Sequence, residues 1–116
     1  MDMKWLDCIE AAVTVCDPDG IIVYMNSQAA ESFRDQGGMA LIGKSIFDCH
    51  REESNNQVRK MLKEGMSNAY TVEKNGKKKF VWQAPLLEGG VCKGLVEMVI
   101  PIPSDLRNVI RDIPTS

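Results

Sequence analysis

The chain has 116 residues, which is enough for one domain with a single core and too few for two. Its composition, 44% hydrophobic and 26% charged with a formal net charge of −2, is typical of a soluble globular domain and excludes a disordered chain. No apolar run is long enough to cross a bilayer, no secretory signal is visible, and the basic residues form only one short cluster at 77–79. We therefore expect a cytoplasmic protein that binds neither a membrane nor nucleic acid.

The cysteines and the single histidine do not form a recognisable metal site. Cys8, Cys16, Cys49 and Cys92 are widely spaced, and His50 is the only histidine. This spacing excludes the common zinc sites, and in a reducing compartment the cysteines are expected to be free thiols. We predict no bound metal.

The first expected element is a short amphipathic helix at residues 2–10. Trp5, Leu6 and Ile9 fall on one side of this helix. The apolar side needs a surface to cover.

A β-hairpin is predicted after this helix. The strand AVTVCD begins at Ala12, a Pro-Asp-Gly turn follows at 18–20, and IIVYM from Ile21 is the returning strand. Asn26 ends that strand and is expected to cap the helix SQAAESFRDQ through its side-chain oxygen.

A longer helix is predicted to end near Gly65. Ser54 and Gln57 have the spacing of a capping box, and Gly65 is a favourable residue for a helix end. The apolar stripe of this helix consists of Val58, Met61 and Leu62. His50 is then expected just before the helix N-terminus.

Three strands with an alternating pattern complete the sheet. They are AYTVEK from Ala69, KKFVWQAPLL from Lys78, and a last strand from Val91 to Ile100. Asn75-Gly76 and Glu88-Gly89-Gly90 supply the turns between them.

Together these elements predict an α+β fold. It contains a five-stranded antiparallel sheet, a helical crossover between strands 2 and 3, and an N-terminal capping helix. We expect the domain at residues 1–103 and a C-terminal linker at 104–116 in which a signalling helix could begin. On the presumed outer face of the sheet, Trp82, Leu95 and Val99 are too apolar to face water, so the N-terminal helix or a partner subunit should cover them.

The ordered set of motifs resembles the PAS domain family over nearly the whole chain. The motifs are VTVCDPDGIIVYMN, the helix AAESF, the turn GKSIFDC, the helix ending at Gly65, and the hairpins with KGLVEMVIPI. The segments GKSIFDCH and GLVEM are also similar to PAS units attached to hemerythrin-like domains in bacteria. The resemblance implies a sensory and dimerising module with a ligand or cofactor pocket between sheet and helices, joined to an output domain in a longer parent protein.

No cofactor is predicted. Flavin-binding PAS photoreceptors carry an Asn-Cys-Arg-Phe-Leu-Gln run in the crossover, and this chain has no match to it. Haem-binding PAS domains commonly use a histidine on the long crossover helix, whereas His50 is expected before that helix. We interpret His50 as a loop residue at the rim of the pocket; haem ligation and contact with an anionic ligand are the alternatives.

The predicted pocket combines the long helix with the inward face of the sheet. Strand alternation and the PAS pattern place Gln83 on that face, where its amide would need hydrogen-bonding partners. The candidate ligand-binding residues are Val58, Met61, Leu62, Thr71, Gln83, Val96 and Met98. Ordinary core packing is the competing interpretation of the methionines.

We expect the chain to be a small-molecule-sensing PAS module of a bacterial signalling protein. We do not expect an enzyme, because a nucleophile needs a base and the sequence gives His50 no partner whose position can be argued. The predicted homodimer interface consists of Trp5, Leu6, Ile9, Trp82, Leu95 and Val99. The alternatives are a ligand-free dimerisation platform and a haem- or flavin-based redox or gas sensor.

Overall fold

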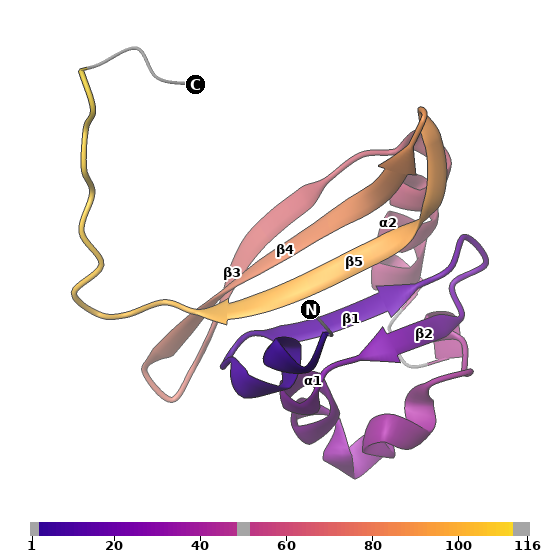
Figure 1. Ribbon diagram of the computed structural model, residues 1–116, viewed down its shortest axis with the longest axis horizontal. Helices are drawn as coiled ribbons and strands as arrows, with labels where there is room; N and C mark the ends of the chain where they lie inside the picture. The colour runs from indigo at the N-terminus through magenta and orange to yellow at the C-terminus, as the bar shows by residue number, and fades with distance from the viewer. Residues whose placement is uncertain (1–2, 49–51, 113–116) are drawn as a thin grey trace.

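A five-stranded antiparallel sheet with the strand order β2-β1-β5-β4-β3 forms the centre of the fold (Figure 1). The computed structural model describes residues 3–48 and 52–112. The strands are β1 (Ala12–Cys16), β2 (Ile22–Met25), β3 (Asn68–Lys74), β4 (Lys77–Glu88) and β5 (Val91–Pro101). The predicted fold class is confirmed, because the chain crosses between strands 2 and 3 through helical segments.

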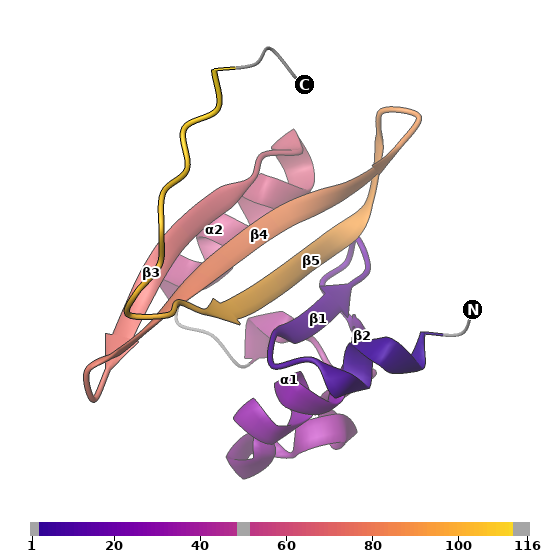
Figure 2. The same cartoon turned by 60° about the vertical axis from the view of Figure 1, so that its left-hand side comes forward.

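The crossover contains two α-helices and several single turns of 3-10 helix. The α-helices are α1 (Ser27–Ser32) and α2 (Glu52–Glu64), and the 3-10 segments between them are η2 (Arg34–Gln36), η3 (Gly38–Leu41) and η4 (Ile46–Asp48). These segments all lie on one side of the sheet (Figure 2), where α2 contacts β4 and β5 and α1 contacts β1 and β2. None of the helices among the described residues is long and apolar enough to span a membrane.

The start of α1 and the end of α2 agree with the sequence, but α1 ends at Ser32 and the rest of the predicted helix is the separate 3-10 segment η2. The Asn26 side chain caps α1 by accepting a hydrogen bond from the amide of Ala29 at 3.0 Å, as predicted. The helix α2 ends before Gly65, whose φ of 66° favours glycine. Its predicted start is wrong, because Ser54 lies inside a helix that already includes Glu52 and therefore cannot be the N-cap.

The two ends of the chain differ from the expected helices. The N-terminal helix is a 3-10 segment, η1 (Lys4–Cys8), that lies over the start of α1, where Asp7 Oδ1 accepts from the Ser27 amide at 2.8 Å. The C-terminal segment leaves the end of β5 in an extended form (Figure 1). Residues 104–112 contain no helix, and Leu106, Val109 and Ile110 are exposed.

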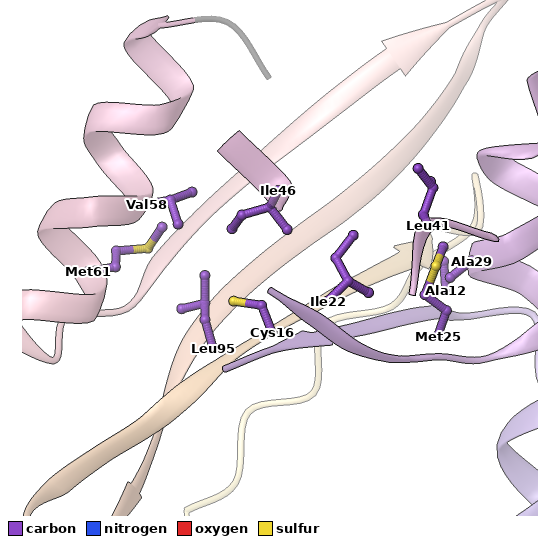
Figure 3. Packing of buried hydrophobic residues seen from close by; sticks show 10 residues of the cluster. All are labelled: Ala12, Cys16, Ile22, Met25, Ala29, Leu41, Ile46, Val58, Met61 and Leu95. Carbon is purple, nitrogen blue, oxygen red and sulfur yellow. The ribbon is translucent and has the colours of Figure 1, made fainter. Parts of the chain in front are cut away.

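The register of the strands decides which side chains face the crossover helices. Residues directly opposite each other in an antiparallel sheet lie on the same face. On β1 and β5 the inner face consists of the pairs Cys16–Leu95, Thr14–Glu97 and Ala12–Val99. The buried cluster between this face and the helices contains Ala12, Cys16, Ile22, Met25, Ala29, Leu41, Ile46, Val58, Met61 and Leu95 (Figure 3).

The orientation that we predicted for β5 is therefore wrong. Leu95 and Val99 were expected on the outer face, but Leu95 is 4% exposed within the core and Val99 packs against it. Val96 and Met98, which were expected in the pocket, lie on the outer face. Over residues 95–100 of β5 both alternating rows are apolar except for Glu97, and this carboxylate lies in the inward row, where hydrophobicity alone would not place it.

Candidate ligand-binding site

A cavity of about 80 Å³ lies between the inner face of the sheet and the crossover helices. Most of its lining is apolar, and Figure 3 shows Val58 of α2 and Ile46 of η4 opposite Leu95 and Ile22 of the sheet. The lining residues are Thr14, Cys16, Ile22, Met25, Phe33, Gln36, Leu41, Ile46, Val58, Gln83, Leu95 and Glu97. This is the space in which the resemblance to PAS domains implied a pocket.

One row of polar side chains crosses the inner face of the sheet beside this cavity. Thr14 of β1 lies opposite Glu97 of β5, which lies opposite Gln83 of β4, which lies opposite Asn68 of β3. The Asn68 Nδ2 donates to Gln83 Oε1 at 3.1 Å, and the Gln83 Nε2 donates to Glu97 Oε2 at 2.8 Å. The amide of Gln83 is 8% exposed and thus has a partner at each end, as a buried amide requires.

A second, more open crevice of about 360 Å³ lies between α2 and strands β3 and β4. It shares Val58, Gln83 and Glu97 with the inner cavity, so the Gln83–Glu97 pair borders both spaces. Tyr70 also lines this crevice, and its pKa is raised first by burial and second by the charge of Glu97. Glu97 therefore acts electrostatically on the crevice as well as bonding within the row.

The thiol of Cys16 in the cavity wall is not an activated nucleophile. The pKa of Cys16 is raised to about 11, mainly by burial; a backbone hydrogen bond with Leu95 opposes this rise, and the charge of Asp17 adds a smaller increase. A thiol with a pKa well above neutral stays protonated and reacts slowly. Cys16 is thus best described as a small apolar side chain of the core.

The structure brings together only part of the predicted pocket set. Val58 and Gln83 line the cavity. Met61 is fully buried and Leu62 partly buried in the packing around α2, whereas Thr71 is exposed on β3. His50 and Cys49 lie outside the described residues, so the rim position predicted for His50 stays a prediction.

The predicted interface residues also separate. Leu6 and Leu95 are buried within the chain and Ile9 is partly buried, but Trp5 and Trp82 are 50% and 40% exposed. The outer face of the sheet carries Trp82 together with Val96, Met98 and Ile100. An apolar outer face exists, as expected, but a different row of β5 forms it.

The most informative residue that the sequence interpretation missed is Glu97. It is the one charged residue in the apolar run LVEMVI. A charge inside a central strand needs a partner or a function, and this requirement could have identified it as a site residue. Thr14 and Gln36 were also missed, and nothing in their local sequence distinguishes them.

The cavity does not fit a haem or a flavin without rearrangement. Its volume of about 80 Å³ is well below the roughly 300–1,000 Å³ of ligand pockets for larger molecules. Among residues 3–48 and 52–112, no group of three or more His, Cys, Asp or Glu side chains could hold a metal ion.

Residues 6–100 match a protein-family model described as the PAS fold. A comparison with curated protein sequences finds no significant match.

Several solved structures share the fold of this chain at low sequence identity. A C-terminal domain from Streptococcus mutans is 21% identical with a TM-score of 0.67, and the alignment covers 84% of this chain and 79% of that one. A sensory box sensor histidine kinase from Vibrio cholerae is 18% identical with a TM-score of 0.59, covering 86% and 88%. VqmA bound to DPO is 15% identical with a TM-score of 0.68, covering 88% of this chain and 56% of VqmA.

Proposed function

The chain belongs to the PAS-fold family, and from this membership we propose that it is the small-molecule-sensing module of a cytoplasmic bacterial signalling protein. The ligand would bind in the cavity between the inner face of the sheet and the crossover helices. The observation that carries this proposal is the polar row at Thr14, Glu97 and Gln83 beside a mostly apolar cavity. A few polar groups in an apolar pocket are typical of small-molecule sites, where they orient the ligand.

Two of the similar structures support a signalling role for such a domain. One is described as a sensor histidine kinase, and the other, VqmA, is described as bound to DPO, so the same fold occurs both in a sensor kinase and in a protein with a bound ligand. In our proposal the domain detects its ligand without catalysing a reaction, and an output domain in a longer protein responds to it.

We also propose that the sensor works without haem or flavin. The small volume of the cavity supports this proposal. The purified protein should therefore be colourless, and a Soret or flavin absorbance band that survives gel filtration would contradict the proposal.

Binding to the cavity can be tested with a variant that fills it. Val58→Trp places a large side chain in the cavity wall, and overpacking of this kind costs about 1–3 kcal/mol of stability. Lys60→Trp is a matched control, because Lys60 lies exposed on the same helix. A metabolite library is screened by thermal shift and native mass spectrometry against all three proteins.

We expect at least one metabolite to bind the wild type and Lys60→Trp but not Val58→Trp. If no compound binds the wild type, or if every compound binds Val58→Trp equally well, the ligand does not occupy this cavity.

The domain is further proposed to form a homodimer through the outer face of the sheet. Trp82 and Ile100 are 40% and 38% exposed on that face, and Val96 and Met98 of β5 lie on the same face. An apolar patch of this kind on a soluble domain marks an interaction surface, and symmetric pairing is the commonest outcome. This observation also favours the second candidate function, a dimerisation platform without a ligand.

A further inference from the structure

We propose that the ligand of the inner cavity is a small organic cation, with an ammonium group that binds the carboxylate of Glu97 and an apolar body that packs in the cavity. This inference rests on the proposed sensing function and adds to it the chemical class of the ligand. It follows from the direction of the hydrogen bonds in the polar row, from the charges around the cavity and from the shape of the space.

The hydrogen bonds of the polar row all point toward Glu97. A carboxylate only accepts hydrogen bonds, so the atom of Gln83 that faces it, 2.8 Å from Oε2, must be the amide nitrogen. The oxygen of Gln83 is then left to accept from Asn68 at 3.1 Å. A carboxylate offers about four lone-pair positions, and the described residues use one of them in a hydrogen bond. The remaining acceptor capacity of the row lies at Glu97, where a ligand with N–H donors would use it.

The charges around the site also favour a cation. No lysine or arginine is among the described residues that line the cavity or the crevice, and the crevice adds a second carboxylate, Glu53. The ion pairs seen between described residues, Arg34–Glu31, Arg59–Glu52 and Lys78–Glu73, do not involve Glu97. A partly buried carboxylate without a cationic partner attracts a positive ligand and repels a negative one.

The shape of the space selects an organic cation over a metal ion. Glu97 is joined by neutral amides and not by further metal-ligating side chains, and no group of three such side chains occurs in the described part of the chain. Phe33, Leu41 and Leu95 supply an apolar wall for the body of the ligand. Because Glu97 borders both the cavity of about 80 Å³ and the crevice of about 360 Å³, the ammonium group can bind it while the apolar body packs inward.

Three probes of equal ring size and different charge test this inference. Benzylamine is a cation at pH 7, benzyl alcohol is neutral and benzoate is an anion. Their binding to the wild type is measured by ligand-observed NMR, with dissociation constants from titration. Glu97→Gln removes the charge and keeps the shape, and Glu88→Gln removes a charge from an exposed position on β4 as a matched control.

We expect the wild type and Glu88→Gln to bind benzylamine at least about tenfold more tightly than benzyl alcohol and to show no binding of benzoate. Glu97→Gln should lose that tenfold preference and retain the weak binding of benzyl alcohol. If benzyl alcohol or benzoate binds the wild type as tightly as benzylamine does, the cation inference is wrong while the sensing function stands. If none of the three probes binds and the metabolite screen is also empty, the proposed function itself fails. If Glu97→Gln does not fold, the affinities of the wild type for the three probes still test whether the site prefers a cation.

Discussion

At the scale of single residues, Asn26 joins three segments that meet at one edge of the sheet. Its side chain is fully buried, and besides capping α1 it accepts from the amide of Val13 at 2.9 Å. Its Nδ2 donates to the carbonyls of Leu6 at 2.7 Å and Ala11 at 2.8 Å. One amide therefore satisfies backbone groups from η1, β1 and α1, although the sequence predicts only its role as a helix cap.

Replacing Asn26 with Ala should destabilise the domain by about 3–5 kcal/mol. The change removes a helix cap, worth about 1 kcal/mol, and leaves buried backbone groups without partners at about 1–3 kcal/mol each. Urea unfolding measures the loss. Asn56→Ala on the exposed face of α2 is the matched control and should cost less than about 0.5 kcal/mol. Equal losses in the two variants would show that the buried bonds of Asn26 do not stabilise the fold.

At the scale of secondary-structure elements, the contact between β1 and β5 depends on Gly94. This residue has a φ of 143° and is buried, and a Cβ placed on it would overlap the carbonyl oxygen of Cys16. The close approach therefore requires a residue without a side chain. The two central strands can pair along their length only because of it.

Gly94→Ala should push β1 away from β5 and cost several kcal/mol more than Gly90→Ala. Gly90 has a φ of 79°, but a Cβ added to it would meet no other atom within 4 Å, so its replacement should cost only the backbone strain of about 1–2 kcal/mol. Denaturant unfolding compares the two, and hydrogen exchange should become faster in β1 of the Gly94 variant. A similar stability of both variants would refute the requirement for glycine at this contact.

The sequence predicts most elements of this fold, because its turn residues are distinctive. Asn75-Gly76 defines the β3–β4 hairpin, and Gly65 defines the end of α2. The faces of β5 were not predictable in the same way, since apolar residues occupy both rows over residues 95–100 and the one charged residue of that stretch, Glu97, lies in the inward row. The cavity was expected in the correct layer, but three of the four sheet residues predicted for it, Thr71, Val96 and Met98, lie on the outer face.

At the scale of the whole molecule, the outer face of the sheet is the surface where a second copy would pack. Trp82→Glu combined with Ile100→Lys places charges on this face at two side chains that are already 40% and 38% exposed, so folding should be little affected. We expect the wild type to be a dimer and this double variant to be a monomer in analytical ultracentrifugation.

The matched control for the dimer is Leu87→Glu combined with Val91→Lys. These side chains are 57% and 56% exposed at the far end of the β4–β5 hairpin, and the control should remain dimeric. A wild type that is monomeric at high micromolar concentration would overturn the dimer. If the control dissociates and the first double variant stays dimeric, the interface lies at the end of the β4–β5 hairpin.

The alternation of β5 has a consequence for how the length of this chain can vary among related sequences. Leu95, Glu97 and Val99 lie on the inner face of the sheet, and the residues between them lie on the outer face. Inserting or deleting a single residue within this strand would exchange the two rows, turning Glu97 toward the outer surface and Met98 toward the cavity. Insertions and deletions should therefore be tolerated at the Gly89-Gly90 turn. Within residues 95–99 they should be removed by selection, even where an inserted residue is apolar.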